Sequence, residues 1–74
     1  MKITVKLFAT LRNGRFNENV FDTDNCRDID SLLQKINIKR EEVAIIFING
    51  KHGNFDTVIA EGDDIALFPP IGGG

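Results

Sequence analysis

The chain has 74 residues, with nine basic and eleven acidic side chains, a formal net charge of −2 and 42% apolar residues. A chain of this length forms one small domain with a thin core, and it leaves little room for a deep active site. The weak negative charge argues against a general nucleic-acid-binding protein. The single cysteine excludes an intramolecular disulfide and a metal site built on several thiolates. No apolar run approaches the roughly 20 residues that cross a bilayer, so we expect a cytoplasmic protein that does not bind membranes.

The first part of the chain has the pattern of a β-hairpin. From Lys2 to Phe8 apolar and polar residues alternate, which is typical of a half-buried strand. The pair Asn13-Gly14 is the strongest short hairpin signal, because both residues tolerate positive φ. Residues 16–22 follow it and predict a second strand, antiparallel to the first.

The hydrophobic period then changes to that of a helix. Asp28 is placed as the N-cap, and Asp30 favours the positive end of the helix dipole. A loop led by Asn37 is expected to follow. The apolar residues with helical spacing are Ile29, Leu32, Leu33 and Ile36.

The last third of the chain predicts three more strands. Residues 43–48 are continuously apolar and rich in β-branched side chains, which indicates a strand buried on both faces. Residues 51–54 predict a short edge strand. A turn at 62–63 precedes a final strand over 64–68, with Ile65 and Leu67 facing inward. The prolines at 69–70 end this strand, because proline cannot donate to a β-ladder.

This order of elements predicts an α+β fold. A mixed sheet of four to five strands with one helix packed across one face is the β-grasp arrangement, the architecture of ubiquitin. The strands joined by the helix are expected to be parallel and neighbouring, or nearly so. We therefore divide the chain into a β-grasp domain over 1–68 and a flexible, glycine-rich C-terminal tail over 69–74.

The tail has an unusual composition. Its base, Pro69-Pro70, favours the stiff polyproline II conformation, and its tip is three glycines with the fewest steric limits. Fully extended, the tail reaches roughly 20 Å from the domain. Such an end can thread a narrow channel and present the α-carboxylate of Gly74 to a partner's active site, as a substrate. The alternative is a frayed terminus without function.

Two motifs make the chain similar to a known family. Residues 8–12, Phe-Ala-Thr-Leu-Arg, resemble the FAxLR motif of the small subunit of molybdopterin synthase. Residues 62–74 resemble the family's GD-x-hydrophobic strand followed by FPP-x-x-GG. The predicted helix and the phrase Ile-Asn-Gly at 48–50 fall where the family has its helix and its NG turn. Over nearly its whole length the chain thus resembles the MoaD/ThiS-type ubiquitin-like sulfur carriers.

The resemblance implies a sulfur carrier with no catalytic residue, no metal and no bound cofactor. In this family an E1-like enzyme uses ATP to adenylate the terminal glycine carboxylate, and sulfur then replaces AMP to give a thiocarboxylate. The loaded tail enters the large subunit of molybdopterin synthase and delivers sulfur to a pterin precursor. Carried over by position, Gly74 is the residue that is adenylated and thiocarboxylated, and Gly72 and Gly73 thread the tail. The residues implied to bind the partner are Phe8, Phe68, Pro70 and Ile71.

Three other functions stay open. The chain resembles the carriers of thiamine thiazole synthesis too, which also end in glycines, so the tail alone does not separate the two sulfur pathways. A ubiquitin-like modifier would be joined through Gly74 to lysines of other proteins, and a plain binding module would have an inert tail. Residues 51–54, Lys-His-Gly-Asn, stand where many relatives have apolar residues that face the partner. This departure weakens the predicted apolar patch.

The remaining polar residues predict no chemistry of their own. We expect His52 to be solvated and Cys26 to be a small, partly buried filler. Asp63 and Asp64 are adjacent in sequence and point to opposite faces of a strand, which argues against a metal site. Three cations form either a small basic patch or ordinary solvated charge: Lys6, Arg12 and Arg15.

Overall fold

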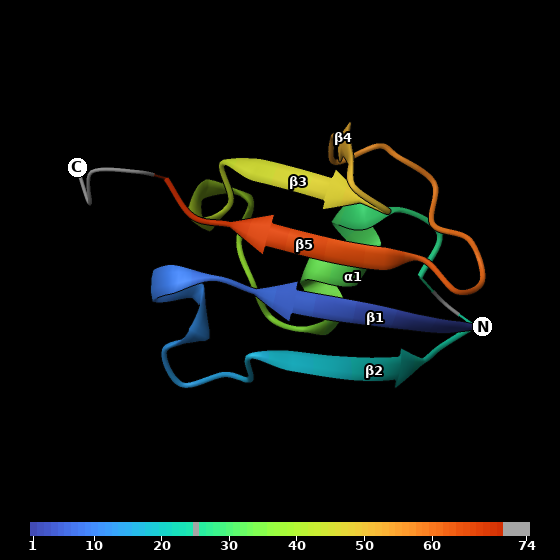
Figure 1. Cartoon of the computed structure of the whole chain (residues 1–74), viewed down its shortest axis with the longest axis horizontal. Helices are drawn as coiled ribbons and strands as arrows, with labels where there is room; N and C mark the ends of the chain where they lie inside the picture. Colours follow the sequence, from blue (N-terminus) through green and yellow to red (C-terminus); the bar gives the residue numbers. More distant parts are fainter. Residues whose placement is uncertain (25, 71–74) are drawn as a thin grey trace.

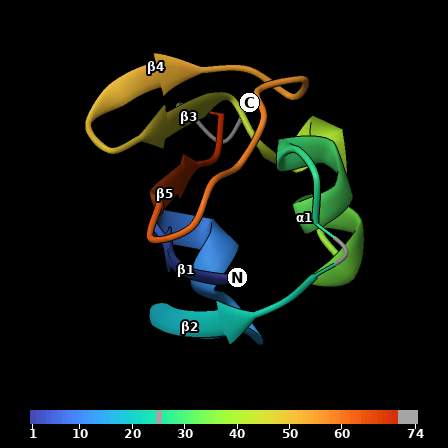
Figure 2. The ribbon, with the colours of Figure 1, turned by 90° about the vertical axis from the view of Figure 1, so that its right-hand side faces the viewer.

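The computed structural model describes residues 1–24 and 26–70. Within them, one α-helix lies across one face of a five-stranded mixed sheet (Figures 1 and 2). The elements in chain order are β1 (Lys2–Leu7), η1 (Ala9–Arg12), β2 (Glu18–Asp22), α1 (Ile29–Lys35), η2 (Arg40–Glu42), β3 (Ile45–Ile48), β4 (Lys51–Gly53) and β5 (Asp64–Phe68), where η marks a 3-10 helix. The predicted β-grasp fold is confirmed.

The strands are arranged in the order β2-β1-β5-β3-β4. The first and last strands, β1 and β5, pair in parallel at the centre, and the other neighbours are antiparallel. The strands on either side of α1 in sequence, β2 and β3, are separated by β1 and β5. They run parallel, as expected, but two strands lie between them, so they are not adjacent in the sheet.

The core lies between the sheet and α1. Strands β1 and β5 alternate strictly, so that every second side chain of each is buried against the helix. Cys26 is 4% exposed and its Sγ accepts a hydrogen bond from Thr23 Oγ1 at 3.7 Å, which confirms it as a core residue. The residues that are at most 1% exposed are Ile3, Val5, Leu7, Leu11, Ile29, Leu32, Leu33, Ile65 and Leu67.

The predicted limits of the helix are confirmed. Asp28 is the N-cap, and its Oδ1 accepts hydrogen bonds from the backbone N and the Oγ of Ser31 at 2.9 and 2.8 Å. The helix ends at Lys35, and Asn37 has a positive φ of 62°. Asparagine tolerates this left-handed conformation, which turns the chain back toward the sheet.

Because the side chain of Asp28 caps the helix as a carboxylate, we expect the fold to lose stability in acid. Hydrogen bonds from Ser31 lower the pKa of Asp28, and a hydrogen bond from Arg40 lowers the pKa of Asp30. A lowered pKa in the folded state stabilises the fold above the unfolded pKa and ceases to do so as pH falls through the folded pKa. We expect the free energy of unfolding to decrease as pH drops below about 4.

The variant Asp28→Asn tests this expectation. Asparagine keeps an oxygen acceptor at the N-cap but does not titrate. The stability at neutral pH should change only slightly, and the difference between neutral and acidic pH should shrink. Urea unfolding at the two pH values measures both quantities. An undiminished difference in the variant would contradict the role given to Asp28.

The connection between β1 and β2 differs from the prediction. The two strands pair as an antiparallel hairpin, but the loop spans residues 8–17 and contains η1. Asn13 has an ordinary φ of −62°, and only Gly14 is at positive φ. The pair forms a turn closed by the hydrogen bond from Arg15 N to Arg12 O at 2.9 Å. The prediction of a tight two-residue hairpin at Asn13-Gly14 is therefore wrong, and β2 begins two residues later than expected.

The strand β3 is not buried on both faces, contrary to the prediction. Only Ile46 is fully buried. The sheet has a helix on one side alone, so alternate residues of β3 face away from it (Figure 2). Ile45 and Phe47 pair with Phe68 and Ala66 of β5 and share their outward face. An apolar run thus marks a strand whose outer face is apolar and half-exposed.

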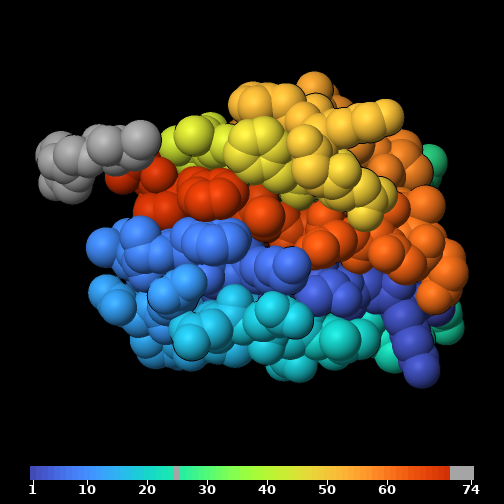
Figure 3. Space-filling model, in the orientation of Figure 1, coloured from blue at the N-terminus to red at the C-terminus, as the bar shows by residue number. Residues whose placement is uncertain are grey.

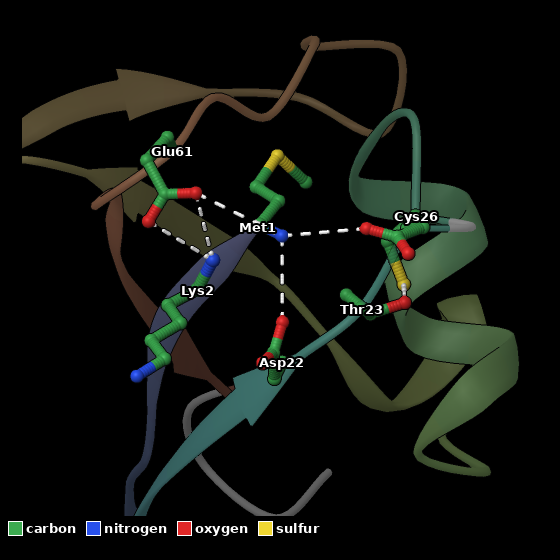
Figure 4. Close-up of polar contacts among 7 residues, drawn as sticks. Met1, Lys2, Asp22, Thr23, Cys26 and Glu61 are labelled. Carbon is green, nitrogen blue, oxygen red and sulfur yellow. Dashed lines mark hydrogen bonds and ion pairs between the residues drawn. The ribbon is translucent and has the colours of Figure 1, made fainter.

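The start of the chain is tied to two other segments at one end of the sheet (Figure 4). The Met1 α-amino nitrogen lies 3.4 Å from Oδ1 of Asp22 and 3.4 Å from Oδ1 of Asp24. The Lys2 backbone N donates to both carboxylate oxygens of Glu61, at 3.0 and 3.1 Å. These contacts join β1, the end of β2 and the turn before β5 at the end of the sheet opposite the end of β5 (Figure 1).

Candidate functional site

The sheet face opposite α1, here called the helix-free face, carries two stacked phenylalanines. Leu7 of β1 is paired with Leu67 of β5, so the next residues, Phe8 and Phe68, lie side by side. Both side chains are half-buried, and their rings stack with centroids 4.3 Å apart and planes 9° apart. Two of the residues predicted to bind a partner are thus brought together by the parallel pairing of the first and last strands.

Two more rings extend this pair across the sheet. Phe47 of β3 meets Phe68 edge-on, with centroids 5.8 Å apart. His52 of β4 is paired with Phe47 and meets it edge-on at 5.4 Å. We call Phe8, Phe68, Phe47 and His52 the aromatic row. It crosses four neighbouring strands, and its stacked and edge-on geometries are those that aromatic pairs prefer.

Local backbone geometry holds the first ring in the row. Ala9 has a positive φ of 53°, which turns the chain from β1 into η1. The turn leaves Phe8 on the helix-free face and returns Leu11 to the core, where it is 1% exposed. The guanidinium carbon of Arg12 lies 5.5 Å from the centre of the Phe8 ring. Phe68 stacks on the same ring, so Arg12 lies at the Phe8 end of the row.

The rest of the helix-free face carries both polar and apolar side chains, and Val20 of β2, paired with Thr4, is 59% exposed there. Lys6 Nζ lies 3.1 Å from Asp64 Oδ2, and this hydrogen bond raises the pKa of Lys6. In the register of the sheet, Lys6 lies opposite Glu18 of β2 on one side and opposite Ala66 of β5 on the other. The ring contacts on this face are those of the aromatic row, which includes the end of β5.

The base of the tail adjoins the aromatic row. β5 ends at Phe68, as predicted, with the half-buried Pro69 and the exposed Pro70 after it. The end of β5 lies between β1 and β3 on the helix-free face (Figure 3). Pro70, predicted to bind a partner, is thus exposed two residues from a ring of the row. The other predicted tail residues lie outside the described part of the chain: Ile71, Gly72, Gly73 and Gly74.

Two residues of the row were not predicted to lie in the site. Phe47 lies in the apolar run over 43–48. That run predicted a strand buried on both faces, so none of its residues was expected at the surface. His52 is exposed, as expected, and its edge-on contact with Phe47 was not predicted. Its neighbour Gly53 has a packing role, since a Cβ there would lie 2.9 Å from Ile48 Cδ1. The antiparallel register of β3 and β4 is the feature that places Phe47 beside His52 on the helix-free face.

The remaining candidate sites are structural. Asp63 is buried, and its carboxylate accepts hydrogen bonds from Asn49 Nδ2 and Ala60 N, both at 2.8 Å. Asp64 pairs with Lys6 on the other face, as the alternation of a strand predicts. Among residues 1–24 and 26–70 no three His, Cys, Asp or Glu side chains are grouped to hold a metal ion. No helix in the same residues is long and apolar enough to cross a membrane.

The three cations considered as a basic patch do not share one role. Lys6 is paired with Asp64, and Arg15 Nη2 lies 3.3 Å from Glu42 Oε1. Arg12 instead donates from Nε to the Leu7 carbonyl at 2.8 Å. The first two charges are neutralised within the chain, and the third lies at the end of the aromatic row.

Comparison with known proteins gives one family match. The profile of the ThiS family matches residues 5–74, nearly the whole chain. No curated protein sequence matches it.

Several solved structures have the same fold. SAMP1 of Haloferax volcanii is 23% identical with a TM-score of 0.73, and the match covers 100% of both chains. A chain of the complex of subunits 1 and 2 of the molybdopterin-converting factor from Helicobacter pylori is 24% identical with a TM-score of 0.67, again over 100% of both chains. The small archaeal modifier protein 1 of Methanosarcina acetivorans is 26% identical with a TM-score of 0.67, over 99% of this chain and 96% of that one.

Proposed function

This chain belongs to the ThiS family, and on that premise we propose that it is a sulfur carrier that acts through the α-carboxylate of Gly74. The observation that carries the proposal is the position of the aromatic row at the base of the tail. A partially exposed apolar patch marks an interface, and this one adjoins the segment that has to be delivered to an active site. Docking and delivery then use neighbouring parts of one small domain.

The proposed chemistry requires a second protein. A carboxylate is a poor electrophile, so an E1-like enzyme supplies the activation. The Gly74 carboxylate attacks the α-phosphate of ATP, pyrophosphate leaves, and an acyl-adenylate forms. Hydrosulfide then attacks the acyl carbon, the bond to AMP breaks, and AMP leaves behind a thiocarboxylate. The carrier contributes a substrate group and a docking face, and ATP is bound by its partner.

The proposed docking face consists of the aromatic row and the base of the tail. Phe8 and Phe68 would bind the partner's apolar surface, and Pro70 with Ile71 would direct the tail away from the domain. A proline at position 70 limits φ and favours an extended path. The threading residues are Gly72 and Gly73, since a chain without Cβ atoms passes through the narrowest channel.

We propose that the acceptor lies in molybdopterin synthesis, with the large subunit of molybdopterin synthase as the second partner. The structural likeness to a chain in the Helicobacter pylori complex of molybdopterin-converting factor subunits 1 and 2 supports this choice. The motif at residues 8–12 and the Phe-Pro-Pro of residues 68–70 favour the same branch. Small size and the absence of a spanning helix in the described residues agree with a cytoplasmic location.

The mass of the C-terminal tryptic peptide from protein isolated from its own cells tests the proposal. Cleavage after Lys51 releases residues 52–74, which contain neither Met nor Cys. This matters because replacing oxygen by sulfur changes the mass almost as adding one oxygen does, and Met and Cys oxidise readily. We expect the sulfur-for-oxygen shift on Gly74. An unmodified carboxylate, under conditions that preserve a control thiocarboxylate, would contradict the proposal.

A protein modifier is the second candidate, because two of the similar structures are small archaeal modifier proteins. It predicts adducts in which Gly74 is joined to lysines of other proteins. A carrier for thiamine thiazole synthesis has the same chemistry and another acceptor. Rescue of a thiamine-requiring mutant, without rescue of a molybdenum-cofactor mutant, would identify that pathway.

A further inference from the structure

Arg12 is exposed at the end of the aromatic row and makes two contacts within the domain. It is the last residue of η1, and its Nε donates to the Leu7 carbonyl at 2.8 Å. Its guanidinium carbon lies 5.5 Å from the centre of the Phe8 ring. These two contacts orient the head group. They leave its two terminal nitrogens with no hydrogen-bond partner among residues 1–24 and 26–70.

The neighbouring cations are neutralised within the chain, in contrast to Arg12. Lys6 lies 3.1 Å from Asp64, and Arg15 lies 3.3 Å from Glu42. No carboxylate of the described residues lies within 4.0 Å of the Arg12 nitrogens. Arg12 therefore presents an exposed, planar pair of donors whose charge has no partner among the described residues.

A protein that covers the aromatic row also covers Arg12. Phe8 is in contact with both Phe68 and Arg12, and Phe68 immediately precedes the base of the tail. Removing water from an unpaired guanidinium is costly unless the partner supplies an acceptor. The two terminal nitrogens match the two oxygens of a carboxylate, which they bind with both geometry and charge.

We propose that Arg12 binds an Asp or Glu side chain of the E1-like adenylating enzyme, at the edge of that enzyme's apolar contact with the aromatic row. This inference rests on the proposed function. It makes Arg12 a specificity-determining residue, because an apolar surface without a carboxylate beside it would leave the guanidinium buried and unpaired. Arg12 takes no part in the chemistry at Gly74 and acts only on docking.

The experiment measures AMP formation by the adenylating enzyme of the same organism, with ATP and the full chain as substrates. For Arg12→Gln we expect the KM for the carrier to rise by about tenfold or more, the effect of losing a charge-assisted pair, with kcat unchanged. Arg12→Lys keeps the charge without the planar fork and should recover only part of the loss. The split between KM and kcat separates a docking role from a general loss of activity.

Lys35→Gln is the matched control. It removes the same charge from an exposed residue of α1, on the other side of the sheet, and should leave KM unchanged. Melting curves of the three variants establish that each is folded at the assay temperature. An unchanged KM for Arg12→Gln, or an equal rise for Lys35→Gln, overturns the proposal. If the unaltered chain is not adenylated, the proposed function fails together with this inference.

Discussion

Removing Gly74, or adding one alanine after it, should abolish adenylation and leave the fold intact. Either change moves the terminal carboxylate by one residue, about 3.5 Å along an extended chain. Misplacement of a reacting group by only 1 Å can lower a rate about 100-fold. The shortened chain still ends in two glycines, so it tests the position of the carboxylate and not its chemical identity.

The measurements are AMP formation by the adenylating enzyme and thermal unfolding of the free chain. Lys35→Gln is the control, since it leaves the whole tail unchanged and alters only an exposed residue of α1. It should be adenylated, and all three variants should unfold near the temperature of the unaltered chain. Adenylation of the extended chain at an unchanged rate would contradict the assignment of Gly74.

Replacing Phe68 should separate docking from stability. In Phe68→Ala the central ring of the aromatic row is lost, together with its contacts to Phe8 and Phe47. Truncating a central aromatic residue of an interface commonly costs about 2 kcal/mol or more of binding free energy, which is about 30-fold in affinity. We expect the KM for adenylation to rise by at least this factor. Because the side chain is half-buried in the free chain, the loss of folding stability should be smaller, about 1–2 kcal/mol.

Ile65→Val is the matched control on the same strand. Ile65 is fully buried on the opposite face of β5, against α1. Losing one methyl group there costs about 0.5–1.5 kcal/mol of stability, comparable to the loss in Phe68→Ala. Its KM should stay unchanged, because the aromatic row is intact. Urea unfolding and steady-state adenylation measure the two quantities. If KM rises in both variants in proportion to the loss of folding stability, the aromatic row is not the docking face.

Local patterns in the sequence predicted most of the elements. The alternation in β1 and β5 and the helical spacing of α1 are properties of neighbouring residues, and they state which face of each element is buried. The cap at Asp28 and the stop at Pro69 also depend on local geometry alone. The hairpin at Asn13-Gly14 failed for a tertiary reason. Leu11 is buried in the core, so the loop folds into η1 before the turn is reached.

The outer face of β3 could not be predicted from its own residues. A continuous apolar run is expected both for a strand covered on two sides and for one whose outer face is an interface. The choice between these two cases depends on whether helices cover one face of the sheet or both, which is a property of the tertiary structure. The contact of His52 with Phe47 could not be predicted for a similar reason, because it depends on the register of two strands.

By itself, the sequence determined the order of the elements and the buried face of most of them, and it predicts a tail suited to present a terminal carboxylate. These features depend on residues within a few positions of one another. The tertiary structure alone decided that Phe8, Phe68, Phe47 and His52 form one row, and that no carboxylate in residues 1–24 and 26–70 pairs with Arg12 at its end. The physical reason is that strand order and register bring residues up to 60 positions apart into contact, as in the pairing of Leu7 with Leu67.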